Sequence, residues 1–212
     1  AAHSLALGGA SAGLVVTLAT VMVLGLQKTP TAWKKSLLTL TTVGYAFPGA
    51  VLGLGILIPL AAFDNWLADL VLASLRRDPG LLLTGSAGAL IVAYCVRFFA
   101  IGVGAAEAGL AAISTNIPLA ASTLGRGPKD VMINIYQPLM RGSLASAMVL
   151  VFVDTVKELP ATLLLRPFNF DTLSTHVYGQ ASLENFHGST PAALLIITLS
   201  LGAIFLLAKA HR

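Results

Sequence analysis

Five long stretches of the chain consist almost entirely of apolar residues, and shorter polar segments separate them. They lie at 4–26, 44–62, 81–104, 142–165 and 188–208, and the first charged residue is Lys28. The hydrocarbon core of a bilayer is about 30 Å thick, so a helix needs roughly 20 apolar residues to cross it. Strands facing lipid would leave unpaired edges. The pattern therefore predicts an all-α fold, a polytopic bundle of about five spanning helices in one membrane domain over 1–212.

Composition supports a lipid environment and excludes a soluble binding module. Hydrophobic residues make up 56% of the chain and charged residues only 10%, whereas soluble domains carry about 25% charged residues. The basic residues are scattered through loops rather than gathered in a stripe with aromatic residues, so we expect no nucleic-acid partner.

The basic residues also predict an orientation, because loops on the cytoplasmic side of a membrane are richer in lysine and arginine. Five spans place the two termini on opposite sides. One side then holds Lys28, Lys34, Lys35, Arg126, Lys129, Arg141, Lys209 and Arg212, and the other holds Arg76, Arg77 and Arg166. We expect the richer side to be cytoplasmic, with the N-terminus outside and the C-terminus inside.

The long polar connection at 105–141 carries a helix–glycine–helix pattern. Residues 117–124 are compatible with a helix that Gly125 would end. Pro128 suits the first turn of a second helix, and Pro138 is expected to end it.

An apolar face is predicted on this second helix. Val131, Met132 and Ile135 would lie together by their helical spacing. Such a face can insert into a groove of a cytoplasmic partner or lie flat on the membrane surface, and the spacing alone leaves both possibilities open.

Charged residues inside the apolar stretches are the candidate translocation path. Arg97 interrupts the third stretch, and Asp154, Lys157 and Glu158 interrupt the fourth. The last three would share a helix face at i, i+3 and i+4. Each lone charge at the bilayer centre costs roughly 2.5–3.5 kcal/mol, so these residues need partners or a wet cavity. They either line the path or its gate, or form a structural ion pair with Arg97 as partner.

Two short motifs have an ordinary explanation as well as a functional one. Gly9 and Gly13, and likewise Gly49 and Gly53, form GxxxG spacings. These let helices approach closely, either within this domain or against a second membrane domain. The stretch around Ser11 also matches GxSxG, but it lies inside a predicted membrane helix rather than at a strand–turn–helix elbow, which argues against an intramembrane hydrolase.

The polar connection resembles the "EAA" loop of type I ABC importer permeases, which follows the pattern E-A-A-x-x-x-G and then I-x-L-P. The matching residues are Leu119-Ala120-Ala121-Ser122-Thr123-Leu124-Gly125 and Ile135-Tyr136-Gln137-Pro138. The resemblance implies a MetI-like domain in which this loop forms a coupling helix that inserts into a cytoplasmic ATPase dimer. Leu119 departs from the family glutamate, and Gln137 departs from the leucine before the proline.

A second and longer resemblance concerns the substrate. Residues 152–173, from Phe152 to Leu173, are similar to the matching stretch of ferric-iron importer permeases. This implies transport of ferric iron across the bacterial inner membrane, with the external loop 166–187 either facing a periplasmic ferric-binding protein or serving as a connector. Because ferric iron prefers oxygen ligands, Asp154 and Glu158 are candidates for transient contacts with it, whereas Lys157 beside them argues against a tight site. It further implies a second membrane domain, fused or separate, and suggests that this chain is the C-terminal domain of a longer permease.

The resemblance places the ATP and magnesium in the partner ATPase and implies that this chain binds no cofactor and catalyses no reaction. Related permeases carry thiamine, polyamines, sulfate or phosphonates, so another solute is an alternative. An ion-coupled secondary transporter is a further alternative, because such folds often contain interrupted helices near the midplane.

Overall fold

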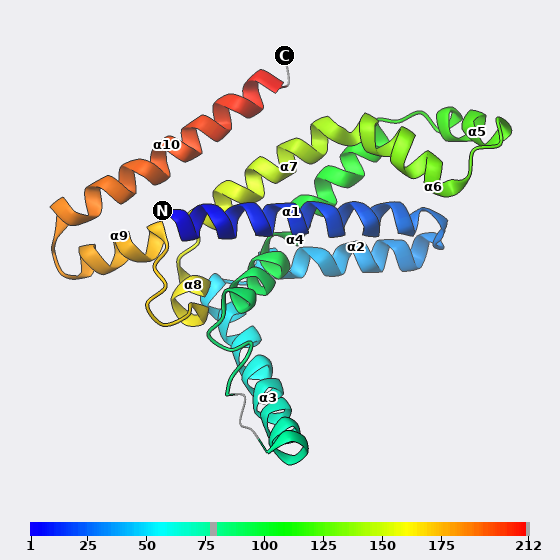
Figure 1. Cartoon of the computed structure of the whole chain (residues 1–212). Coiled ribbons are helices and arrows are strands. Elements are labelled where there is room, and N and C mark those ends of the chain that lie inside the picture. The colour runs from blue at the N-terminus through cyan, green and yellow to red at the C-terminus, as the bar shows by residue number, and fades with distance from the viewer. Residues whose placement is uncertain (77–79, 211–212) are drawn as a thin grey trace.

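The computed structural model describes residues 1–76 and 80–210, and every regular element within these ranges is helical (Figure 1). Five helical segments are long and apolar enough to cross a membrane, which confirms the predicted all-α polytopic fold. Arg77 and Arg212, used above to predict orientation, lie outside the described residues, as does the side chain of Lys28. The elements are α1 (Ala2–Gly25), η1 (Leu26–Lys28), α2 (Thr31–Ala46), α3 (Gly49–Leu75), α4 (Ala87–Ala111), α5 (Asn116–Thr123), α6 (Pro128–Val131), η2 (Met132–Tyr136), α7 (Gln137–Lys157), α8 (Pro160–Leu165), α9 (Leu173–Ser182) and α10 (Phe186–Ala210).

Three helices, α1, α4 and α7, pack against one another and form the centre of the bundle. Val15, Tyr94 and Val151 are buried there in one apolar cluster. Small residues let the helices approach closely: a Cβ added at Gly102 on α4 would lie 2.9 Å from a side-chain carbon of Val15 on α1. Because lipid is as apolar as the core, this close packing is a main source of helix association.

The second predicted span is divided between two helices. We expected one helix over 44–62, but α2 ends at Ala46, Phe47 is extended, and α3 begins at Gly49 and continues to Leu75. Pro48 explains the break, because proline disfavours helical geometry in the residue before it and suits a helix start. As a result α2 lies along α4, and α3 turns away from the bundle near α8 (Figure 1).

The third and fourth predicted spans also have different ends. The helix expected over 81–104 runs from Ala87 to Ala111, because Ser86 caps its N-terminus by accepting a hydrogen bond from the backbone N–H of Ala89. The helix expected over 142–165 begins earlier, at Gln137, and ends at Lys157. Glu158 is extended, and the short helix α8 follows.

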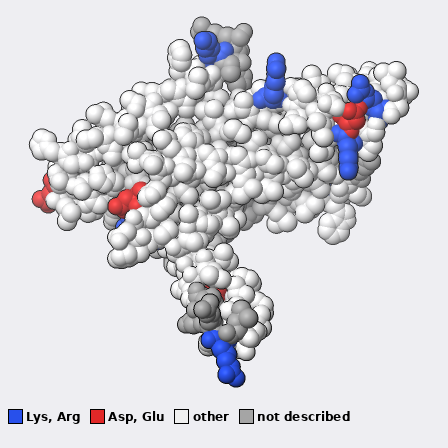
Figure 2. All heavy atoms as spheres, viewed as in Figure 1, with Lys and Arg blue, Asp and Glu red and all other residues white. Residues whose placement is uncertain are grey.

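The charged side chains lie mainly at the extremities of the molecule. On the face shown in Figure 2 they gather beside α5 and α6, near α9 and at the tip of α3, with isolated basic side chains over α7 and at the end of α10, and most of the remaining surface is uncharged. The helices α3 and α10 leave most of their apolar side chains exposed, including Ile58, Leu201 and Phe205. Lipid or a second membrane domain can cover such surfaces.

Candidate functional site

The end of α5 is a glycine-dependent turn. Gly125 has φ +79°, a conformation that residues with a Cβ rarely adopt. Its N–H donates to the carbonyl of Ser122, and the N–H of Arg126 donates to the carbonyl of Ala121. These two bonds form a Schellman motif, the common way to satisfy the last carbonyls of a helix. The glycine of the predicted loop motif is therefore required by the backbone.

The second half of the loop differs from the sequence prediction. Pro128 occupies the first turn of α6, as expected, but Pro138 does not end a helix. A π-helical turn, η2, joins α6 to α7 without interruption. The π turn is wider than an α turn and breaks the i→i−4 register, so the proline, which has no N–H, is accommodated with a bend rather than a stop.

The exposed surface of the loop is apolar but is not made by the residues that we expected. Val131 is buried, with 6% of its surface exposed, so it does not join Met132 on an outer face. The exposed apolar residues of the loop include Leu119, Leu124, Met132 and Ile133, and Leu124 is 83% exposed. Ile135 is half-buried, while Ala120 is exposed and Ala121 is buried. The expectation of an exposed Val131–Met132–Ile135 face was wrong, because Val131 is buried and Ile135 is half-buried while only Met132 is exposed.

Two grooves flank this loop at the α1–α2 turn. The first, about 460 Å³, is lined by residues such as Lys34, Leu110 and Leu119. The second, about 500 Å³, is lined among others by Arg126 and Met132. A hydrogen bond of 3.1 Å from the Tyr136 hydroxyl to the Gln27 side-chain carbonyl ties the loop to the α1–α2 turn between them. The loop is thus attached to the bundle on one side and exposed on the other.

The intramembrane charges form two separate pairs. Arg97 Nε lies 3.1 Å from Glu158 Oε2, although its N–H is not aligned for a hydrogen bond. Lys157 Nζ lies 2.7 Å from Asp154 Oδ1. The expectation that Asp154, Lys157 and Glu158 share one helix face was wrong, because α7 ends at Lys157 and the extended backbone turns Glu158 toward α4.

The Arg97–Glu158 pair is the more buried of the two. The Glu158 side chain is 7% exposed and that of Arg97 is 20% exposed, whereas Lys157 is 56% exposed. The second carboxylate oxygen of Glu158 accepts a 3.2 Å hydrogen bond from the N–H of Ala161 at the start of α8. A buried carboxylate with a guanidinium and a helix N–H is well compensated for its loss of water.

Polar residues that the sequence analysis did not single out complete this region. The carbonyl of Glu158 accepts hydrogen bonds from the hydroxyls of Thr162 and Ser174, at 2.7 and 2.8 Å. The hydroxyl of Tyr94 lies 2.6 Å from that of Thr162. These residues come from α4, α8 and α9. Because residues with hydroxyl groups are common in apolar segments, the sequence alone does not predict this network.

The two GxxxG spacings lie in different surroundings. A Cβ added at Gly53 would contact Ala161 and Leu164 of α8, and one at Gly49 would contact Arg97 and Glu158. The spacing of Gly49 and Gly53 therefore allows close packing within this chain. A Cβ at Gly9 or at Gly13 would meet no atom of the described residues within 4 Å, so a contact of that face with a second membrane domain stays a prediction.

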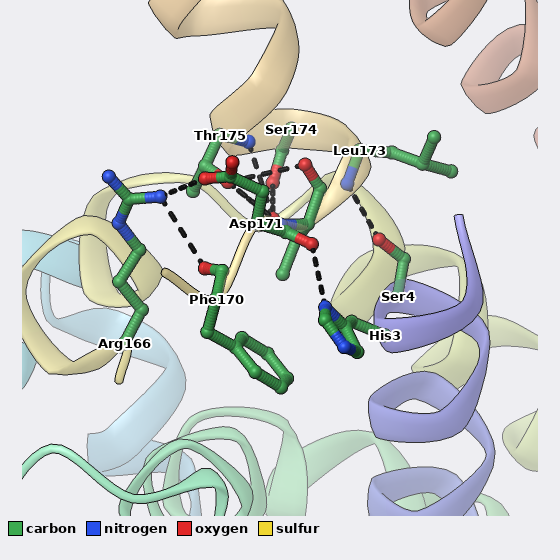
Figure 3. Close-up of polar contacts among 9 residues, drawn as sticks. His3, Ser4, Arg166, Phe170, Asp171, Leu173, Ser174 and Thr175 are labelled. Carbon is green, nitrogen blue, oxygen red and sulfur yellow. Dashed lines mark hydrogen bonds and ion pairs between the residues drawn. The ribbon is translucent and has the colours of Figure 1, made fainter. Parts of the chain in front are cut away.

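The loop at 166–172 is tied to the N-terminus of α1 (Figure 3). Arg166 pairs with Asp171, and the ring of His3 stacks on Phe170 at a centroid distance of 4.0 Å. The hydroxyl of Ser4 accepts a 2.6 Å hydrogen bond from the N–H of Leu173, which opens α9. The part of the 166–187 loop that precedes α9 is therefore held by contacts with the bundle.

Comparison with known proteins agrees with this architecture. No family model matches the chain. It is 32% identical over 120 residues, 57% of its length, to the Fe(3+)-transport system permease protein FbpB 2 of Haemophilus influenzae. The chain is similar to an iron-transport permease. The match covers 24% of that iron-transport permease, so the chain spans well under two thirds of its relative's length. The predicted resemblance is confirmed, and the five apolar helices agree with a multi-pass membrane protein.

Proposed function

We propose that the chain is a membrane-spanning permease subunit of an ATP-driven importer that moves ferric iron across the bacterial inner membrane. In this proposal a periplasmic binding protein delivers the iron, and a separate cytoplasmic subunit hydrolyses ATP and binds magnesium. The observation that carries the proposal is the similarity to an iron-transport permease over more than half of the chain.

The geometry of the loop supports coupling to an ATPase. Leu119, Leu124, Met132 and Ile133 are exposed on a segment whose turn is fixed by the Schellman motif and whose base is bonded to the α1–α2 turn. An ordered apolar projection suits insertion into a protein groove, because little conformational entropy is lost on binding. A secondary transporter needs no such projection, although the break between α7 and α8 would also suit one.

The opposite end of the bundle is the proposed docking side for the iron-binding protein. Phe168 is 95% exposed and Leu183 is 77% exposed, and both belong to the external loop 166–187. The pairs around Arg166 and His3 order the first part of this loop, so Phe168 is presented by a defined backbone.

Iron would meet carboxylates only transiently on its way. Asp154 and Glu158 are both paired with basic side chains, and the described residues contain no group of three or more His, Cys, Asp or Glu residues that could hold a metal.

The coupling role is tested by placing a carboxylate on the exposed apolar surface of the loop. Leu124→Glu is expected to abolish co-purification of the ATPase, because the charge would have to be buried without a partner. Leu183→Glu is the matched control, since Leu183 has similar exposure at the other end of the bundle. Normal ATPase binding by both variants would refute the proposed contact.

A further inference from the structure

Two interruptions of the helical backbone meet beside the middle of α4. Phe47, between α2 and α3, is extended with φ −77° and ψ 142°, and Glu158, between α7 and α8, is extended with φ −67° and ψ 122°. Arg97 on α4 contacts both: its Nη1 donates to the carbonyl of Phe47 at 3.0 Å, and its Nε lies 3.1 Å from Glu158 Oε2. One side chain thus joins two breaks that are far apart in the sequence.

The start of α3 is shaped to admit this ion pair. A Cβ added at Gly49 would lie 2.6 Å from Glu158 Oε1 and 3.2 Å from Arg97 Nη1. Glu158 cannot move aside freely, because the same oxygen is bonded to the N–H of Ala161. Only glycine at this position lets the α2–α3 corner approach the carboxylate.

A buried ion pair contributes little net stability, but it can distinguish two conformations of a protein. Apolar side chains of similar size often stabilise a fold as well as a buried pair does, because the pair must lose its hydration. A pair can instead be broken and reformed between two conformations, and extended residues between helices are the places where backbone angles change in hinge motions. Phe47 and Glu158 are such residues, and Arg97 connects them.

We propose that Arg97 and Glu158, with Gly49 as the positioning residue, form a latch that holds the α2–α3 corner against the α7–α8 break and is released once in each transport cycle. This inference rests on the proposed function and adds to it the element that would close the path in one of its two states. The latch requires both the Arg97–Glu158 ion pair and the close approach of α3 to it. Only a glycine at position 49 permits that approach.

The single cysteine of the chain is a built-in reporter of this corner. Cys95 is half-buried on α4, two residues before Arg97. It lines a groove of about 460 Å³ between α2 and α4, together with Thr41 and Gly44. When the α2–α3 corner separates from α4, Cys95 becomes more accessible, so its rate of labelling by a maleimide measures the open fraction of the latch.

The test compares Gly49→Ala with Gly55→Ala in the reconstituted transporter with its ATPase. Both glycines lie on α3, but a Cβ at Gly55 meets nothing within 4 Å. Labelling of Cys95 is followed by peptide mass spectrometry without nucleotide, and iron uptake and ATP hydrolysis are measured alongside. We expect Gly49→Ala to raise the labelling rate by about fivefold or more, and to hydrolyse ATP with less iron moved per ATP, while Gly55→Ala behaves as the unchanged protein.

The wild-type protein provides a second measurement that does not depend on the variant folding. Labelling of Cys95 should be faster in the complex trapped with a non-hydrolysable ATP analogue than in the nucleotide-free complex. Equal rates in those two states, or a Gly49→Ala protein with wild-type labelling and wild-type coupling, would overturn the latch. ATP-driven uptake that persists with such results leaves the proposed function standing, whereas uptake indifferent to ATP would remove both.

Discussion

The turn at Gly125 allows a sharp test of how the coupling loop is built. Gly125 and Gly127 both have open space where a Cβ would stand, but Gly125 has φ +79° and Gly127 has φ −71°. An L-residue in the left-handed region costs roughly 1–2 kcal/mol. Replacing glycine also restricts the unfolded chain, which returns about 0.4–1 kcal/mol. Gly125→Ala should therefore destabilise the turn by about 1 kcal/mol, while Gly127→Ala should be close to neutral.

The assay is hydrogen exchange of the backbone amides that the Schellman motif protects. About 1 kcal/mol corresponds to about a fivefold rise in the open population of the turn. The backbone amides at positions 125 and 126 should therefore exchange about fivefold faster in Gly125→Ala than in the control Gly127→Ala. Gly125→Asn should recover much of the protection, since asparagine tolerates this conformation best among residues with a Cβ. Equal exchange in the two alanine variants would refute the argument that the backbone requires glycine at this position.

Two further substitutions test the packing of the bundle. Gly44→Ala would place a methyl group 2.1 Å from the backbone carbonyl oxygen of Val96. Only a shift of α2 away from α4 can relieve this clash, so we expect the free energy of unfolding in a denaturant titration to fall by about 3 kcal/mol. Gly13→Ala is the control without a clash and should be neutral or slightly stabilising; an equal loss in both would contradict the packing. Tyr94→Phe removes the bond to Thr162, whose hydroxyl keeps its bond to the carbonyl of Glu158. Stability should fall by about 0.6–1 kcal/mol and Tm by about 1–4 °C in thermal unfolding, and an unchanged Tm would show that the bond contributes nothing.

Much of the fold could be predicted from the distribution of charge along the chain. The helices α1 and α10 lie where charge-free stretches predicted them, at 4–26 and 188–208. In lipid a backbone segment must satisfy its own hydrogen bonds, so a sufficiently long apolar run forms a helix. The turn at Gly125 and the helix start at Pro128 were also predicted, because the conformations of these residues are set locally.

The interruptions of the helices could not be placed in the same way. The stretch 36–63 contains no charged residue, and hydropathy does not distinguish one helix from two that meet at Pro48. Likewise the α-helical spacing placed Glu158 on a face with Asp154, whereas the helix ends just before Glu158. The break after Lys157 turns Glu158 to Arg97 on α4, and pairings over such sequence distances have no local pattern. The same is true of Ser4 and Leu173, which are 169 residues apart.

The most direct test of the central claim is uptake of radiolabelled ferric iron into proteoliposomes that hold the complete permease and its ATPase, with the iron-loaded binding protein added. The account predicts uptake that requires ATP and is abolished by Leu124→Glu but kept by the Gly127→Ala variant. Iron uptake that is indifferent to ATP and to the loop, or ATP-driven uptake of another solute without iron, would contradict it.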